Sequence, residues 1–352
     1  MQPRFRRTLL APIAAIIVLA LTLAACGSSS KSGSPTNASK SSVTLHFGYF
    51  PNVTHAPAIV SVQNKAFENK LGSDVKLEYS TFNAGSDAVT AMLAGALDAS
   101  LMGPNPAINA YQKTNGGVRI ISGVASGGAS LIVKPNINSA ADLKGKKIAT
   151  PQLGNTQDVA LRSWLNKNGV HVTKDGGDAT ILAQDNAITL TSFQEGSIDA
   201  AWVPEPWATR LVVEGGGKEL VDERTLWPQG KFTTTVLVVT KKFLDAHPDV
   251  VEHLVEGLLD GIDLTKKNAA QAQQLTNQGI QAITGKTLSD EVITKSWKKL
   301  TFTADPIASS LQTSADNAKS LGFLDSSDLG DIFDLSIVNK ALKARGEAEV
   351  AS

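Results

Sequence analysis

Two stretches of the sequence decide the fold: AGALDASLMGPNPAI at residues 94–108 and EGSIDAAWVPEPWAT at residues 195–209. They align without a gap at an offset of 101 residues, since residue 195 matches residue 94. Each reads as a helix end with glycine, an Asp-Ala pair, a short strand and a Pro-x-Pro turn that opens another helix. Any two helix–turn–strand units share some of these features. The match of Asp98-Ala99 with Asp199-Ala200 favours a true repeat and predicts two related α/β domains.

Short β-rich runs alternate with helical periodicity around both stretches, which is typical of parallel sheets with crossover helices. The second domain is predicted to be inserted in the first, because two β-runs, residues 130–134 and 234–240, lead from one domain to the other and back. Together they form a hinge. The chain after the hinge is predicted to be helical, with helices at residues 248–264, 269–283, 289–300, 308–321 and 328–345.

The N-terminus has the parts of a bacterial export signal. Three arginines precede an apolar run at residues 9–23, and the run ends in Leu-Ala-Ala-Cys at Cys26, the single cysteine of the chain. This ending resembles the lipobox of bacterial lipoproteins, which implies that Cys26 is lipidated and that the rest of the chain works outside the cytoplasm. The alternative is an ordinary signal peptide or membrane anchor. Residues 27–42 are rich in serine, glycine and lysine, which is typical of a flexible tether.

The domain organisation follows from these patterns. The predicted segments are a signal peptide (1–25), the lipidated cysteine and tether (26–42), the first part of lobe 1 (43–137), lobe 2 (138–232), the hinge return with the helical rest of lobe 1 (233–345) and a tail (346–352).

Composition excludes several classes of function. The chain has 33 basic and 33 acidic residues, and residues 1–25 hold three arginines and no acid, so the rest has 30 against 33. There is no basic stripe for nucleic acid. With Cys26 used for lipid, neither a disulfide nor a cysteine metal site is expected, and the five histidines lack metal-ligand spacing. No metal and no cofactor are predicted.

Ligands of open α/β sheets bind beyond the carboxyl ends of the strands, where helices begin. The predicted strands therefore point to six loops, at residues 51–55, 103–106, 126–129, 152–158, 204–207 and 232–235. These loops contain no Gly-x-Ser-x-Gly elbow, no argued Ser/His/Asp set and no facing pair of carboxylates. The sequence favours binding over catalysis, so no catalytic residue is assigned.

Several loop residues have two interpretations. Thr156 opens a helix and serves either as its N-cap or as a donor to an anion. His55 either donates to an anionic ligand or lies at the surface or a helix cap. Glu205 on a cleft loop would favour an amine and repel an anion. Trp207 could form an aromatic wall, whereas Trp202 on a strand is expected in the core.

The chain resembles a solute-binding protein of ABC importers, of the nitrate/sulfonate/taurine-binding group, whose relatives include binders of thiamine pyrimidine precursors. The resemblance covers about residues 43–240 and rests on several short motifs. They are Gly48-Tyr49-Phe50-Pro51-Asn52, Thr54-His55-Ala56-Pro57, Met102-Gly103-Pro104-Asn105-Pro106, Leu143-Lys144-Gly145-Lys146-Lys147-Ile148-Ala149, Gly154-Asn155-Thr156 and Glu205-Pro206-Trp207.

The resemblance implies a two-lobed periplasmic-binding-protein-like (type II) α/β fold with two crossover hinge strands and a helical C-terminal region. It implies a monomer anchored by lipid to the outer face of the cell membrane, which closes on one small ligand and delivers it to a permease served by an ATPase. The ligand-binding residues implied are Asn52, His55, Gly103, Pro104, Asn105, Gly127, Gly128, Asn155, Thr156, Glu205, Trp207, Thr233 and Thr234.

The ligand itself stays open at this point. None of the six loops contains a lysine or arginine, so a sulfonate, taurine or nitrate would depend on backbone N–H groups, hydroxyls and His55. Glu205 instead favours an amine-bearing heterocycle related to the thiamine pyrimidine. Two different functions also stay open, namely a biosynthetic enzyme of the same fold and a receptor that reports to a membrane sensor.

Overall fold

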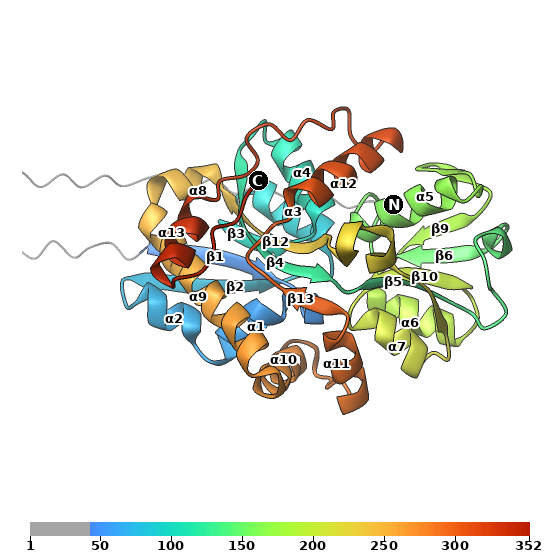
Figure 1. Ribbon diagram of the computed structural model, residues 1–352, viewed down its shortest axis with the longest axis horizontal. Helices are drawn as coiled ribbons and strands as arrows, with labels where there is room; N and C mark the ends of the chain where they lie inside the picture. The colour runs from blue at the N-terminus through green and yellow to red at the C-terminus, as the bar shows by residue number, and fades with distance from the viewer. Residues whose placement is uncertain (1–42) are drawn as a thin grey trace, which may run out of the picture. The chain divides into compact units, whose positions relative to one another are not determined.

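Two mixed sheets organise residues 43–352, which are the residues that the computed structural model describes (Figure 1). The predicted signal peptide, Cys26 and the tether lie outside the described residues. None of the described helices is long and apolar enough to cross a membrane.

The first sheet has six strands, and their order contains the internal repeat. In sheet order they are β13 (Leu300–Phe302), β4 (Val118–Gly127), β12 (Thr233–Thr240), β3 (Ala99–Met102), β1 (Val43–Tyr49) and β2 (Val75–Thr81). Strands β1, β2 and β3 are parallel, whereas β12 is antiparallel to both β3 and β4.

The second sheet repeats five of these positions. Its order is β11 (Lys218–Asp222), β5 (Ala129–Val133), β10 (Ala200–Pro204), β6 (Lys147–Thr150) and β9 (Thr180–Ala183). Strands β6, β9 and β10 are parallel, and β5 is antiparallel to β10 and β11. Parallel and antiparallel pairs therefore occur in the same order in both sheets. A separate two-stranded hairpin joins β7 (Val172–Thr173) and β8 (Gly176–Gly177).

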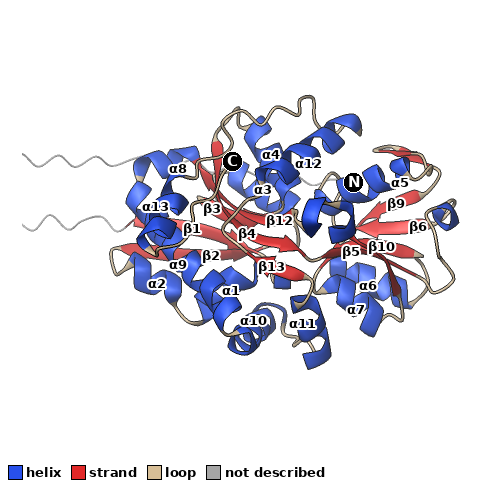
Figure 2. Ribbon diagram, viewed as in Figure 1, coloured by secondary structure: helices blue, strands red, loops and turns tan. Residues whose placement is uncertain are grey.

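Helices cover both faces of each sheet (Figure 2). Around the first sheet lie α1 (Ala56–Gln63), α2 (Ala66–Leu71), α3 (Gly85–Leu93), α4 (Pro104–Lys113) and α8 (Lys241–Ala246), followed by α9 (Pro248–Lys267), α10 (Ala269–Thr284), α11 (Asp290–Trp297), α12 (Ala308–Ser320) and α13 (Ser336–Ala344). Around the second lie α5 (Thr156–Lys167), α6 (Asn186–Gln194) and α7 (Trp207–Val213). Short 3₁₀ turns occur at Val53–His55, Ala141–Leu143, Glu223–Leu226 and Pro228–Gly230.

Burial on both faces explains why the strands read as continuous apolar runs. In β12, Val236 and Val238 pack with α3, α4 and α12, whereas Leu237 and Val239 pack with α1 and α9. The second sheet has the same division. Trp202 of β10 is fully buried in its core, as the sequence predicts.

Three expectations from the sequence need correction. The sequence places residues 130–134 in lobe 1, but β5 pairs with β10 and β11, so the chain enters the second sheet before residue 129. The crossing itself is Gly127-Gly128, where β4 ends. The expected helix at 289–300 ends at Trp297 and gives way to β13, and the one at 328–345 begins only at Ser336.

Candidate functional site

A small cavity of about 30 Å³ lies where strands of both sheets end. Phe50 follows β1, Gly103 follows β3, Pro151 follows β6, and Pro204 ends β10. The other lining residues are Asn52, Thr54, His55, Asn83, Ala84, Gly85, Pro106, Asn155, Thr156, Gln157, Asn186 and Thr234. The predicted residues Asn52, His55, Gly103, Asn155, Thr156 and Thr234 are thus brought together here.

Four helices of at least nine residues begin at this cavity. Gly85 opens α3, Gly103 is the N-cap of α4, Thr156 is the first residue of α5 and Asn186 is the first residue of α6. The N-cap residues of α3, α4 and α6 make no side-chain hydrogen bond to the helix, although Gln152 accepts from the backbone N–H of Ser86 in the first turn of α3. A helix N-terminus carries a partial positive charge and free N–H groups, although Pro104 and Pro106 leave α4 only the N–H of Asn105 among its first three residues. Their convergence therefore makes a field that favours an anion.

Asn155, and not Thr156, caps α5. Its side-chain Oδ1 accepts a hydrogen bond from the backbone N–H of Asp158 at 3.3 Å. The Thr156 hydroxyl is buried and has no hydrogen-bond partner among the described residues, and the same holds for Oδ1 of Asn186. A buried polar atom without a partner costs about 1–3 kcal/mol. These two atoms are therefore available to a ligand.

His55 is a neutral donor. Its Nδ1 accepts the backbone N–H of Phe50 at 3.2 Å, which places the ring proton on Nε2. Its ring stacks on that of Phe50 at 4.3 Å between centroids. Burial lowers the pKa of His55 to about 3. The sequence left two interpretations open, and the geometry assigns this imidazole an N–H donor without a positive charge.

None of the residues that line the cavity is acidic or basic. Asp158 and Arg162, both in α5, form a buried ion pair with each other at 3.0 Å. The carboxylate also accepts from Thr150 and from the backbone of Gly154. No three His, Cys, Asp or Glu side chains within residues 43–352 are placed to hold a metal ion.

Hydrogen bonds between the two domains hold the cavity closed. Trp207 Nε1 donates to Asn52 Oδ1 at 3.0 Å, and Asn83 donates to Asp185 at 3.0 Å. Gln152 accepts from the backbone of Ser86 at 2.8 Å. Gly103 lies so close to Thr156 that a Cβ at Gly103 would come within 2.4 Å of the Thr156 hydroxyl oxygen. Trp207 thus links the two domains through Asn52 and is not among the residues that line this cavity.

Glu205 points away from the cavity. It is 1% exposed, and its carboxylate accepts hydrogen bonds from the backbone and hydroxyl of Thr209 in α7 and from Ser296 of α11. Burial raises the pKa of Glu205, and these hydrogen bonds oppose the shift. Glu205 is therefore not among the residues that line this cavity, and its contact with a ligand stays a prediction. Its carboxylate is engaged by α7 and α11.

The remaining predicted residues lie beside the cavity and do not line it. Gly127 and Gly128 form the crossing between the sheets at φ +81° and +73°, and the Thr234 hydroxyl donates to the carbonyl of Gly127. The backbone N–H of Thr233 donates to the hydroxyl of Ser310 in α12, and the Thr233 hydroxyl donates to the carbonyl of Pro306. Pro104 and Asn105 form the first turn of α4, and Asn105 donates to the carbonyl of Ser314.

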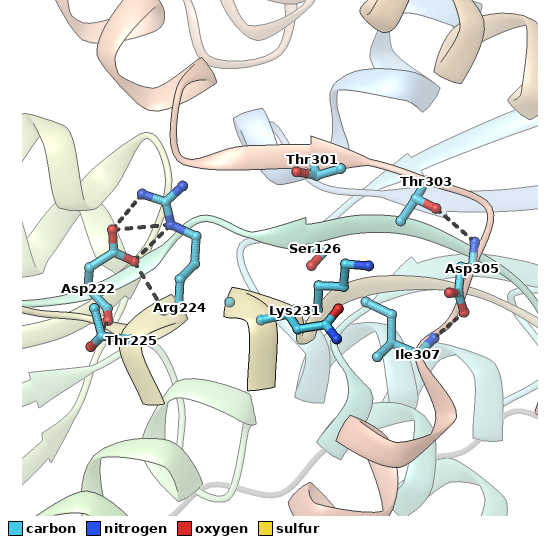
Figure 3. A pocket seen from close by; sticks show the side chains of 11 residues that line it. Ser126, Asp222, Arg224, Thr225, Lys231, Thr301, Thr303, Asp305 and Ile307 are labelled. Atoms are coloured by element: carbon cyan, nitrogen blue, oxygen red, sulfur yellow. Dashed lines mark hydrogen bonds and ion pairs between the residues drawn. The ribbon is translucent and has the colours of Figure 1, made fainter. Parts of the chain in front are cut away.

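A second and wider cavity of about 570 Å³ lies at the hinge (Figure 3). Asp222 at the end of β11 holds Arg224 at 2.6 Å and Lys299 at 3.0 Å. Against the effect of burial, these hydrogen bonds lower the pKa of Asp222 to about 2. The ion pairs therefore stay formed near neutral pH and brace the return from the second sheet.

Sequence reasoning missed Asn83, Gln157 and Asn186. Asn186 follows β9, a strand that the sequence patterns above do not include. The run Thr180-Ile181-Leu182-Ala183 is a signal that could have located it, because the rule of strand carboxyl ends applies there as well.

Comparison with known proteins gives one family and a consistent set of relatives. The model of the NMT1-like family matches residues 38–277. The taurine-binding periplasmic protein of Escherichia coli K12 is 30% identical over 208 residues, which are 58% of this chain and 61% of that protein's length. The bicarbonate-binding protein CmpA of a Synechococcus species is 26% identical over 308 residues, covering 77% of this chain and 67% of CmpA.

Solved structures share the fold. The alkanesulfonate-binding protein SsuA of Xanthomonas axonopodis, bound to MOPS, superposes with a TM-score of 0.68 at 20% identity over 82% of this chain and 96% of SsuA. The nitrate-binding protein NrtA of Synechocystis PCC 6803 gives 0.71 at 16% identity over 86% and 89%. The expected two-lobed type II α/β fold is confirmed, and the chain belongs to the NMT1-like family.

Proposed function

We propose that this protein is an extracytoplasmic solute-binding protein that captures a small oxyanion between its two domains and delivers it to an ABC importer. The carrying observation is the convergence of four helix N-termini on a cavity without charged side chains. Such a site stabilises an anion through N–H and O–H donors and repels a cation. Nitrate, bicarbonate and the sulfonate group of taurine or an alkanesulfonate share this chemistry.

Several relatives support this class of ligand. The proteins named above bind taurine, bicarbonate, alkanesulfonate or nitrate. Because Glu205 faces α7 and α11, the reason for preferring an amine heterocycle is lost. A cavity of 30 Å³ holds little more than a water molecule, so the ligand must widen it on binding. The small anions need the least widening.

The cellular setting belongs to the same proposal. Cys26 is the lipid anchor, residues 27–42 are the tether, and the permease and its ATPase are the partners of a monomeric binding protein. The first domain comprises residues 43–128 and the C-terminal part from residue 233, and the second domain comprises the residues between them. The ligand contacts both domains only in the closed form and therefore stabilises that form.

A thermal-shift and calorimetric panel tests the proposal. Nitrate, bicarbonate, taurine, ethanesulfonate and an aminopyrimidine are compared at equal concentration, and a true ligand at one hundred times its Kd stabilises the protein by about 2.7 kcal/mol. We expect at least one anion to bind and the aminopyrimidine not to bind. Binding by the aminopyrimidine alone, or by no member of the panel, would reject the oxyanion class.

Thr156→Val assigns the site within the same experiment. Removing a hydroxyl that hydrogen-bonds an anion should weaken the anion about tenfold. The unfolding free energy of the ligand-free protein should not fall, because the hydroxyl has no partner to lose. Thr191→Val, at an exposed position of α6, is the matched control. Equal affinity in both variants would place the anion elsewhere.

A further inference from the structure

The wide cavity at the hinge is built by both domains. Asp222, Arg224 and Thr225 come from the end of β11 and the turn after it, whereas Ser126 of β4 and Thr301 of β13 come from the first sheet. The small cavity of about 30 Å³, which we call the oxyanion site, lies toward β3 and β1. In the strand order of the first sheet, β4 and β12 separate the hinge cavity from it. The two cavities are therefore distinct and share the same hinge.

Two lining residues adopt a strained backbone. Gln229 has φ +55°, and Ile307 has φ +49° and ψ +63°. A β-branched residue in the left-handed region is a genuine outlier, and such residues gather at ligand sites where the surroundings hold them. Ile307 is held: its N–H donates to Asp305 Oδ1 at 2.8 Å, and its carbonyl accepts from the Ser310 backbone at 2.8 Å. The wall of the cavity is thus formed in advance.

Two side chains of opposite charge, Lys231 and Asp305, line the cavity and form no ion pair with each other. The Lys231 ammonium forms no ion pair or hydrogen bond among the described residues, and Figure 3 shows it between the Asp222–Arg224 pair and Asp305. Asp305 uses Oδ1 for the backbone of Ile307 and keeps Oδ2 free of hydrogen bonds within residues 43–352. The other charges that face this region, Asp222, Arg224, Glu219 and Lys299, are paired among themselves.

We propose that the hinge cavity is a second binding site, which takes a small zwitterion with its oxyanion on Lys231 and its ammonium on Asp305. The hydroxyl of Thr301, which has no hydrogen bond in the described part of the chain, provides a further polar contact. A ligand with one charge of either sign would engage only one of the two groups, whereas a zwitterion engages both.

The position of the site couples it to domain closure. Its walls belong to different sheets, so their separation changes when the domains rotate about Gly127-Gly128 and residues 223–232. A zwitterion that fits the cavity of the closed form stabilises that form and raises the affinity of the oxyanion site. This coupling rests on the proposed function, whereas binding of the zwitterion does not.

Calorimetry on the purified full chain tests the site with β-alanine as the probe. Propionate lacks its ammonium and propylamine lacks its carboxylate, so both should bind at least about tenfold more weakly. Lys231→Met and Asp305→Asn should each weaken β-alanine about tenfold. Neither variant should unfold the protein, because Lys231 has no partner among the described residues and an asparagine keeps the acceptor for Ile307. Lys286→Met, at an exposed lysine in the turn before α11, is the matched control and should bind as the wild type does.

Thr156→Val separates this site from the oxyanion site. The second site stands if β-alanine binds this variant as it binds the wild type and loses affinity only with Lys231→Met and Asp305→Asn. It is overturned if β-alanine does not bind the wild type, or if its affinity is unchanged in both Lys231→Met and Asp305→Asn. It is also overturned if Thr156→Val abolishes the binding of β-alanine. Failure of the proposed function has a different signature, since nitrate, bicarbonate and ethanesulfonate, which carry no ammonium, would then not bind the wild type at all.

Discussion

The two repeats build the same strand arrangement and then treat the next helix in opposite ways. Asp98 accepts the backbone N–H of His46 at 2.9 Å, and Asp199 accepts that of Lys147 at 3.0 Å. Both partners keep the offset of 101 residues. After the following strand, α4 begins at Pro104 with its N-terminus open to the cavity, whereas the N-terminus of α7 is occupied by the carboxylate of Glu205.

The same strand–turn–helix unit therefore serves a different purpose in each repeat. The first repeat leaves a helix end free for an anion from outside, and the second repeat supplies its own carboxylate to the equivalent helix end. That carboxylate also accepts Ser296 at 2.9 Å and so ties α7 to α11. One repeat contributes a binding surface, and the other contributes rigidity between the domains.

The largest effect on stability is expected from removing Glu205, whose carboxylate occupies the start of α7. Glu205→Ala leaves the Thr209 and Ser296 hydrogen-bond donors without their buried acceptor, and we expect a loss of about 3 kcal/mol in the free energy of unfolding. Chemical denaturation measures this loss. Glu205→Gln keeps an acceptor and is the control. An alanine variant as stable as the wild type would mean that α7 does not need its own anion.

Glu223 is a second buried carboxyl, and its side-chain donors are the indoles of Trp202 and Trp227. Burial raises the pKa of Glu223 from 4.5 to about 7. The folded state therefore binds the proton more tightly. The resulting stabilisation is full below about pH 4.5, falls as the pH rises toward 7, and amounts to about 3 kcal/mol.

Unfolding of wild type and Glu223→Gln across pH 4.5 to 8 measures this effect. The difference in stability between them should change over that range, with the wild type losing relative stability as the pH rises. A constant difference between the two proteins would show that Glu223 does not titrate there.

Gly103→Ala brings the first repeat closer to the second, which has Pro204 at the equivalent position. The backbone of Gly103 tolerates alanine, with φ −73°, but the new Cβ meets the Thr156 hydroxyl oxygen at 2.4 Å. Closure should be hindered and the oxyanion affinity reduced about tenfold, as expected for overpacking. The stability of the ligand-free protein is the control readout. Unchanged affinity would mean that the domains close less tightly than here.

The smallest effects test the shared part of the repeat. Asp98→Ala and Asp199→Ala each remove one acceptor from a backbone N–H, that of His46 in β1 or of Lys147 at the start of β6, and each should cost about 1 kcal/mol. Denaturation midpoints of the two variants should agree closely. If one variant is severely destabilised and the other is not, the two turns do not have equivalent roles.

The repeat explains how much could be predicted from the sequence. Its turn and cap residues depend on local backbone chemistry, so the two-domain repeat, the return strand at residues 234–240 and the loops at residues 51–55, 103–106 and 152–158 follow from short patterns. The outgoing crossing does not, because it lies at Gly127-Gly128 and the run at residues 130–134 belongs to the second sheet. Glu205 could not be placed, because the direction of its side chain depends on Ser296, which is 91 residues away. Asn83 and Asn186 were missed since amides carry no strong motif.

The neutral His55 has a consequence for the surroundings in which the protein could work. Its pKa of about 3 leaves the imidazole uncharged from mildly acidic to alkaline conditions, and no other lining side chain is ionisable. Capture of a strong-acid anion should therefore proceed equally in acidified and in alkaline media.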